Sequence, residues 1–256
     1  MRLHLALLCL GLTIPAQALG DEDGPPAYGE PVNVDELLPN EPGEWELQAS
    51  LEASRQPRES DAESPTYLVA VPRAQILVGL VEGLGAELDV PLVLRKQGEA
   101  TVLGLGDVEL SALLQLLEQN TQAVDLVASM ELLLPTGSER RGLGGGQLEV
   151  SASLAMAITR SAFTWQGTVG YSLAPGDLEQ ELEADFSVAL ALPPALHAYV
   201  ELSGEADLPD FELQLAAGPA MRWTVTPRFA MSAGALFGVT QGATPIRFII
   251  EAQQEF

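Results

Sequence analysis

Residues 181–192 read ELEADFSVALAL, and this stretch decides the fold class. Every even position from Leu182 to Leu192 is apolar, whereas Glu181, Glu183 and Asp185 occupy odd positions. A helix would distribute these acids around its circumference, but a strand places them all on one face. The stretch therefore predicts a β-strand with one apolar face and one acidic face.

The same alternation recurs along the chain, for example in residues 147–159 and 246–253. Clusters of turn residues interrupt it at intervals typical of an all-β protein. Two candidates are less regular. Pro72 removes a ladder hydrogen bond from the second candidate, and a helix stays open for the fourth, where Leu113 and Leu117 interrupt the polar face. The twelve candidate strands are residues 44–54, 67–79, 85–96, 107–118, 123–134, 147–159, 163–173, 180–192, 197–205, 210–223, 228–239 and 245–256.

The chain is both highly charged and apolar. Its 256 residues include 36 acidic and 12 basic side chains, a net charge of −24, yet 47% of them are hydrophobic. The negative charge argues against a nucleic-acid partner, because nucleic acid needs a positive surface. Disordered acidic chains are poor in apolar residues. A barrel in lipid reconciles the two properties, because its strands turn apolar side chains outward and polar ones inward.

The N-terminus has the three parts of a secretory signal. Arg2 supplies the positive charge, residues 3–14 form the apolar run, and residues 16–18 (AQA) form a small-x-small cleavage site. The run is too short for a spanning helix, which needs about 20 residues. Cys9 would leave with the signal, so no disulfide is expected. We expect a cleaved signal peptide at 1–20, a disordered acidic and proline-rich leader at 21–43, and an outer-membrane β-barrel at 44–256.

The connection lengths predict how the strands are oriented. If the first strand runs outward from the periplasm, residues 97–106 and 135–146 are external loops, whereas 119–122 and 160–162 are short periplasmic turns. Bacterial barrels have long outer loops and short inner turns. An even number of strands then returns Phe256, which closes an alternating strand, to the periplasm.

We therefore predict a transmembrane antiparallel up-and-down β-barrel of about twelve strands, in the outer membrane of a Gram-negative bacterium. Phe256 is the predicted assembly signal, read by the barrel-assembly machinery. A soluble secreted β-sandwich is the alternative, because it also alternates apolar and polar faces.

The polar faces of the predicted strands carry most of the acids. Unpaired carboxylates cannot be packed dry, so we expect a hydrated lumen, and rings of acid favour cations. This predicts a monomeric passive channel for small solutes. The alternative is a plugged barrel with a structural or surface-interaction role, because side chains can fill so small a lumen. The predicted lumen-lining residues are Glu46, Glu52, Glu87, Asp89, Glu109, Asp125, Glu131, Glu149, Glu181, Glu183, Asp185, Glu201, Glu212, Glu251 and, as a counter-charge, Arg73.

Two short motifs punctuate the middle of the chain. GLGD at 104–107 opens the fourth strand, and LPTGS at 134–138 closes the fifth, before the glycine-rich stretch ERRGLGGG at 139–146. Glycine supplies the positive φ of tight loops, and proline presets a turn. Loop geometry at the barrel rim is the main interpretation, and ligand contact is the alternative. The turn residues are Gly104, Gly106, Asp107, Pro135, Thr136 and Gly137.

The order of these motifs and strands resembles the outer-membrane transporters of the meta-pathway phenol-degradation type, over roughly residues 44–256. The resemblance implies a small barrel that moves small, often aromatic, compounds across the outer membrane. It implies no catalytic residue.

Enzymatic function has one candidate residue. A membrane esterase needs a base to activate its serine, and His197 is the only histidine after the signal. An ordinary turn residue is the simpler interpretation, so we expect no enzyme. The glycine stretches lack nucleotide-binding spacing, and the acid-rich segments lack a calcium-loop pattern. We expect no cofactor and no metal, and as partners only membrane lipid, the assembly machinery and small solutes.

Overall fold

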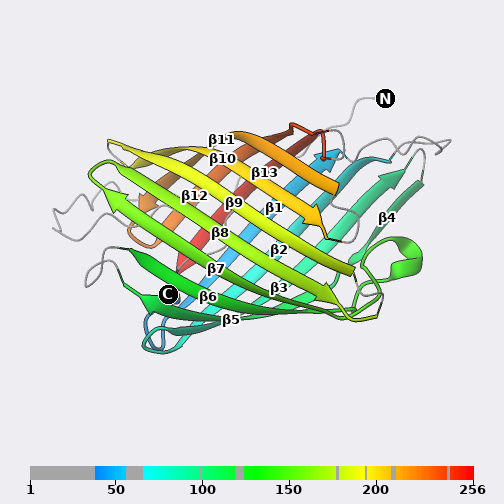
Figure 1. Cartoon of the computed structure of the whole chain (residues 1–256), viewed down its shortest axis with the longest axis horizontal. Helices are drawn as coiled ribbons and strands as arrows, with labels where there is room; N and C mark the ends of the chain where they lie inside the picture. Colours follow the sequence, from blue (N-terminus) through cyan, green and yellow to red (C-terminus); the bar gives the residue numbers. More distant parts are fainter. Residues whose placement is uncertain are drawn as a thin grey trace.

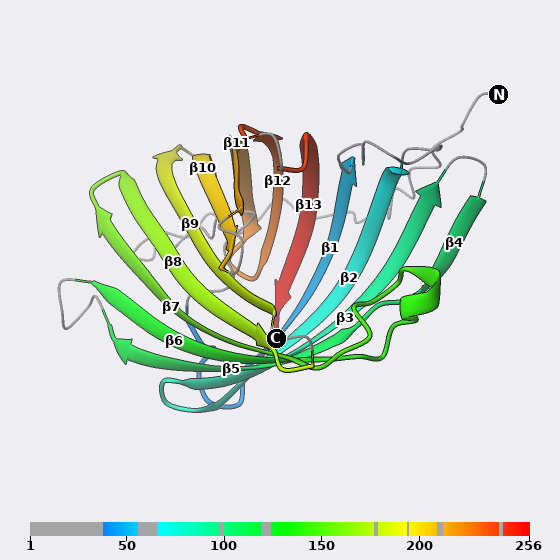
Figure 2. The ribbon, with the colours of Figure 1, turned by 45° about the vertical axis from the view of Figure 1, so that its right-hand side comes forward.

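The strands of the computed structural model form one antiparallel sheet that closes on itself as a barrel (Figures 1 and 2). The structure describes residues 38–55, 66–97, 100–118, 124–176, 179–193, 195–208, 212–240 and 243–256. The ring closes because β1 pairs with β2 on one side and with β13 on the other. The predicted signal peptide, most of the predicted leader and the predicted periplasmic turn at 119–122 lie outside the described residues. The single closed sheet excludes the two-sheet sandwich.

The strands agree closely with the predicted ones, and the predicted barrel is confirmed. They are β1 (Trp45–Arg55), β2 (Thr66–Val81), β3 (Leu84–Gln97), β4 (Ala100–Leu105), β5 (Val108–Leu117), β6 (Asp125–Leu134), β7 (Glu149–Arg160), β8 (Phe163–Ala174), β9 (Glu179–Leu192), β10 (Leu196–Asp207), β11 (Glu212–Thr226), β12 (Phe229–Gly238) and β13 (Ile246–Glu255), with a 3-10 helix, η1 (Glu139–Arg141), between β6 and β7.

Strands β4 and β5 together fill one position in the wall. β3 pairs with β5 as far as Asp89↔Glu109 and then with β4 from Leu92↔Leu105. The register shifts by one residue between the two ladders, which is the signature of a β-bulge. The bulge lies at residues 106–107, inside the GLGD motif. Thirteen strands therefore occupy twelve positions around the ring.

Two sequence interpretations change. The prediction that residues 97–106 form an external loop is wrong, because β3 and β4 make a hairpin there and the bulge concealed the continuity of the strand. Leu103 and Leu105 are 53% and 56% exposed, as expected for an outward strand face. The helical alternative for the fourth candidate is also excluded, because residues 108–117 are strand β5. β2 runs through Pro72, and its ladder with β3 has no pair at that residue.

The two ends of the barrel differ. At one end the turns at 82–83, 161–162 and 227–228 are tight, and the barrel strands both start and finish there. At the other end lie the 135–148 loop and the 239–245 connection. These match the short inner turns and long outer loops of bacterial barrels, so we call them the periplasmic end and the outer end.

The first and last residues of the barrel form its seam. Trp45 and Phe256 stack with ring centroids 4.1 Å apart and an interplanar angle of 9°. The Phe256 N–H donates to the Trp45 carbonyl at 2.9 Å. Because β1 and β13 must pair for the barrel to close, this stack lies where closure is completed at the periplasmic end.

The outer surface of the barrel is apolar. Leu51, Phe186, Met221 and Ile250 are 42–56% exposed, as are many other large apolar side chains on the same strand faces. A band of this kind is what lipid requires of a barrel. Among the described residues, no helix has the length and apolar character needed to cross a bilayer.

Apolar side chains also fill part of the interior. Ala189, Tyr199, Ala220 and Ile249 form one buried cluster from four strands. A second cluster joins Leu77, Leu113 and Val127, and Leu38 packs against it. Residues 38–43, the last part of the expected leader, therefore lie in the barrel interior against the wall. There the Gly43 N–H donates to the Gly79 carbonyl.

Candidate functional site: the lumen and its outer mouth

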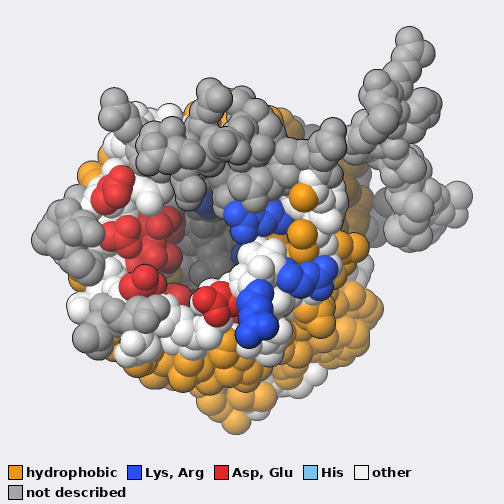
Figure 3. Space-filling model, turned by 90° about the vertical axis from the view of Figure 1, so that its right-hand side faces the viewer, with side chains coloured by type: hydrophobic (Ala, Val, Ile, Leu, Met, Phe, Trp, Pro, Cys, Tyr) orange, Lys and Arg blue, Asp and Glu red, His pale blue; other side chains and the backbone are white. Residues whose placement is uncertain are grey.

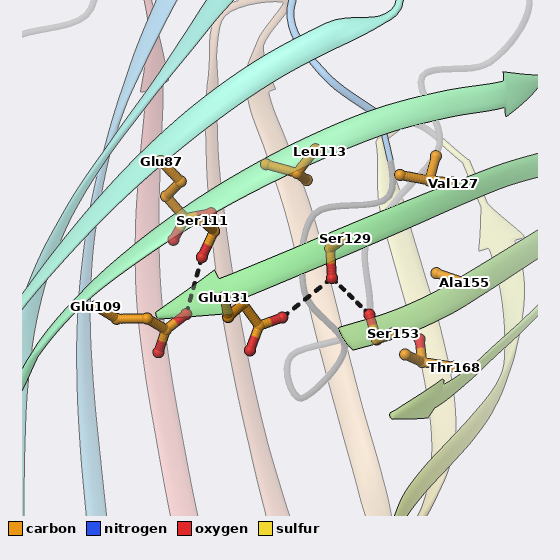
Figure 4. A pocket seen from close by; sticks show the side chains of 10 residues that line it. All are labelled: Glu87, Glu109, Ser111, Leu113, Val127, Ser129, Glu131, Ser153, Ala155 and Thr168. Carbon is orange, nitrogen blue, oxygen red and sulfur yellow. Dashed lines mark hydrogen bonds between the residues drawn. The ribbon is translucent and has the colours of Figure 1, made fainter. Parts of the chain in front are cut away.

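A polar cavity lies against the inner face of β3 and β5–β8 (Figure 4). Its lining combines three carboxylates with four hydroxyls over an apolar floor. Ser129 links the groups, because its hydroxyl donates to Glu131 Oε1 at 3.1 Å and lies 2.6 Å from Ser153 Oγ. The lining residues are Glu87, Glu109, Glu131, Ser111, Ser129, Ser153, Thr168, Leu113, Val127 and Ala155.

The same chemistry continues along the wall into a second cavity. Glu131, Ser153 and Thr168 line both cavities, and the second adds Glu183 and Asp185 from β9. Strands β5–β10 carry no lysine or arginine except Arg160, the last residue of β7. This acid–hydroxyl wall, β5–β10, is therefore strongly negative. Carboxylates and hydroxyls can replace part of the hydration shell of a cation.

The rest of the ring carries the counter-charges. Arg73 on β2 donates to Asp89 Oδ2 at 2.8 Å, and Asp89 is only 3% exposed. Arg247 on β13 lies 3.5 Å from Glu52. A further arginine, Arg222 on β11, donates to Gln253. Strands β5–β10 are therefore almost purely acidic, whereas the rest of the ring mixes arginines with acids.

The predicted lumen residues fall into three groups. Glu46, Asp89, Asp125 and Glu201 are each at most 3% exposed. Others line cavities or hold bonds on the inner face: Glu87, Glu109, Glu131, Glu183, Asp185, Glu52, Glu251 and Arg73. The remaining three, Glu149, Glu181 and Glu212, lie near strand ends at the outer end.

Asp107 ties the motifs into one structure. Its Oδ1 accepts the Gly137 N–H and its Oδ2 accepts the Gly145 N–H, both at 2.7 Å. The Thr136 hydroxyl donates to the Gly106 carbonyl at 2.9 Å and accepts the Val108 N–H at 3.0 Å. GLGD and LPTGS are thus two halves of a clasp, which holds the 135–148 loop against the β4–β5 bulge.

The clasp has room only for glycine at its closest approaches. A Cβ on Gly137 would lie 2.7 Å from the Leu143 carbonyl oxygen and 2.9 Å from Asp107 Oδ1. A Cβ on Gly144 would overlap the Asp107 carboxylate. This packing accounts for the glycines of the motifs by steric closeness as well as by turn geometry.

Sequence reasoning missed the hydroxyls and the clasp. Ser129, Ser153 and Thr168 share the polar faces of their strands with the acids, so the alternation could have identified them. No pattern in the sequence shows that Asp107 bonds a loop about 30 residues away, because the contact depends on how β6 returns beside β5.

The described part of the chain contains His197, the residue considered above for catalysis. No group of three or more His, Cys, Asp or Glu side chains there is arranged to hold a metal. His197 packs near Tyr199, with ring centroids 6.3 Å apart, and its Nδ1 has no hydrogen-bond partner. Its register neighbours are Ala191 and Arg222 rather than a serine.

The closed barrel, its apolar outer surface and its polar, acid-lined interior define a bacterial outer-membrane β-barrel. In lipid only helices and closed barrels can satisfy their backbone hydrogen bonds, and an apolar-out, polar-in barrel is the outer-membrane form. The family whose model is described as “Putative MetA-pathway of phenol degradation” matches residues 42–246. The chain belongs to this family, and the resemblance found in its motifs is confirmed.

Solved structures agree on the fold. An outer membrane channel from Pseudomonas putida F1 superposes with a TM-score of 0.71 at 14% identity, and the match covers 88% of this chain and 100% of that one. KdgM porin and NanC porin each give 0.55 at 8% identity, covering 82% of this chain and 99% and 98% of theirs. No curated protein matches the sequence.

Proposed function

We propose that this barrel is a passive channel for small solutes, with a lumen that favours cations. The observation that carries the proposal is the acid–hydroxyl cavity, which brings Glu87, Glu109 and Glu131 together with no lysine or arginine in its lining. Fixed carboxylates attract cations and repel anions. Since catalysis would need an activated nucleophile, and His197 has no serine beside it in register, the proposal is a non-enzymatic one.

Planar bilayer recordings test the proposal directly. Purified protein should give discrete conductance steps, and a KCl gradient should give a reversal potential that reports preference for K⁺ over Cl⁻. The triple variant Glu87→Gln/Glu109→Gln/Glu131→Gln should conduct with a permeability ratio closer to one. Glu82→Gln is the matched single-site control, because it removes a carboxylate from an exposed turn. Anion preference in the unmodified protein would refute the cation-favouring lumen.

Solute flux follows from the same preparation. The family description names phenol degradation, so small aromatic compounds are the first solutes to test in proteoliposomes. Transport of these compounds without any ionic conductance would support a solute channel and contradict the cation-favouring lumen.

A plugged barrel is the second candidate, and the interior clusters favour it. Tyr199, which is 2% exposed, packs inside the barrel with Ala189, Ala220 and Ile249, and the Leu77 cluster fills a second region. A barrel whose interior is filled throughout would be silent at every voltage. Absence of conductance from a protein whose heat-modifiable gel migration shows a folded barrel would support the structural role.

A further inference from the structure

The outer mouth of the barrel is divided by charge. Acidic side chains gather on one side of the opening and basic side chains on the other, around a central hollow (Figure 3). The acidic side belongs to β9 and β10, where Glu183 pairs in register with Glu205, and Glu181 with Asp207. Like charges directly opposite one another on a sheet are destabilising. This arrangement therefore costs stability.

The basic side comes from β3 and the 135–148 loop. Arg95 lies near the outer end of β3, and η1 contributes Arg140 and Arg141 beside a single acid, Glu139. The Arg141 guanidinium donates to the Leu103 carbonyl at 3.0 Å, which ties it to β4. A Cβ on Gly142 would overlap the Arg95 guanidinium, so the loop passes directly over that arginine.

The 135–148 loop folds onto the inner face of the wall rather than away from it. Gly104 pairs with Val93, on the face opposite to the outward Leu103 and Leu105. A Cβ on Gly104 would lie 2.7 Å from Leu143 Cδ1, and Leu143 is only 4% exposed. Leu143 therefore covers the inner face of β4, and it brings η1 into the mouth.

The two charged sides face each other across the ring. β3 and β10 are six positions apart in either direction around the twelve-position wall. In a closed ring that is the opposite side. The field between Arg95, Arg140 and Arg141 on one side and the β9–β10 acids on the other therefore runs across the mouth, perpendicular to the direction of transport.

We propose that the outer mouth is a charge-divided filter that favours small zwitterions, and that the Asp107 clasp positions its basic side. This inference rests on the proposed channel function. A monovalent ion is attracted by one side and repelled by the other, whereas a zwitterion can turn its ammonium group to the acids and its carboxylate to the arginines. A neutral solute of the same size gains nothing from the field. Complementary fixed charges select partners in this way at protein surfaces.

Asp107 and Thr136 act through the arginines and are positioning residues. Asp107 holds Gly137 and Gly145, the two flanks of the segment that carries η1. Asp107→Asn replaces one acceptor oxygen with a donor that faces a backbone N–H. Thr136→Val removes both bonds of the hydroxyl. Either change should release η1. Thr136→Val leaves all the charges of the mouth in place, and Asp107→Asn removes only the charge of Asp107.

Swelling of proteoliposomes tests the filter. The rate for glycine, a zwitterion, is compared with the rate for glycolamide, a neutral solute of similar size. Arg140→Gln/Arg141→Gln should lower the glycine-to-glycolamide ratio by up to about tenfold, the lower end of the range over which charged clefts raise local substrate concentration. Glu183→Gln/Glu205→Gln should lower it as well. In bilayers the arginine variant should shift ion selectivity towards cations and the glutamate variant towards anions.

Controls separate the filter from general effects of charge. Arg160→Gln removes an arginine from the end of β7 at the periplasmic end and should leave the ratio unchanged. Thr136→Val removes no charge, so a fall in the ratio there reports the position of η1. Asp107→Asn should give the same fall. If either clasp variant fails to assemble, as judged by heat-modifiable migration, the arginine and glutamate variants still test the filter.

The outcomes distinguish the filter from the channel itself. An unmodified protein that conducts but passes glycine no faster than glycolamide overturns the filter and leaves the channel standing. So does an arginine variant with an unchanged ratio. Absence of conductance and swelling in the unmodified protein removes both proposals. A loss of ratio in the arginine variant alone, with both clasp variants normal, overturns the positioning role of Asp107.

Discussion

The stability of the ion pair between Arg73 and Asp89 depends on how far water enters the barrel interior. The Asp89 side chain is 3% exposed and takes one bond, from Arg73 at 2.8 Å, whereas Arg73 is 38% exposed. Its other oxygen, Oδ1, is buried without a partner. Removing the arginine therefore leaves a buried carboxylate with no counter-charge, and breaking a buried pair in this way typically costs about 3–5 kcal/mol.

The perturbation is Arg73→Met, which retains the apolar stem and removes the charge. We expect the free energy of unfolding to fall by about 3–5 kcal/mol. The double variant Arg73→Met/Asp89→Leu should recover most of this loss, because replacing both partners of a buried pair with apolar side chains is often near neutral. Urea unfolding in lipid vesicles, followed by the fluorescence of the three tryptophans, measures each value.

Arg160→Met is the control, because it removes an exposed arginine and should change stability by no more than about 0.5 kcal/mol. A loss below about 1 kcal/mol for Arg73→Met would match an exposed ion pair and not a buried one. It would mean that water reaches Asp89 freely. A double variant as unstable as the single one would show that the arginine stem or the local packing, and not the charge, carries the effect.

Two further variants test the seam and the interior cluster. Phe256→Ala removes the ring stacked on Trp45, an aromatic contact worth about 0.5–1.5 kcal/mol. It should slow the appearance of the heat-modifiable band during refolding more than Phe237→Ala does. Equal refolding rates for the two variants would show that the seam has no special role in closure. Tyr199→Ala should raise single-channel conductance, because the ring fills part of the lumen, and should lower stability by about 3–5 kcal/mol. Tyr171, which is 40% exposed, is the control, and its replacement with Ala should leave the conductance unchanged. Unaltered conductance in Tyr199→Ala would place the narrowest point elsewhere.

The alternation of side chains was enough to predict nearly every strand. In residues 181–192 an apolar side chain occupies every even position, and the structure places this segment in β9. The prediction succeeds because a lipid-facing barrel strand must sort its side chains by polarity at every second residue. It failed at β4, where the bulge at residues 106–107 shifts the period by one and makes a continuous strand resemble a loop.

The sequence by itself determined the fold, the inner and outer faces of the strands, and the motifs that identify the family, because these depend on local periodicity and on short runs of residues. Only the tertiary structure decided which acids gather in one cavity, that Arg73 and Asp89 are partners, and that Asp107 clasps a loop about 30 residues away. These contacts depend on how the sheet curves and where it closes. The same closure brings β3 opposite β10, so the division of charge across the mouth is a property of the ring and not of any one strand.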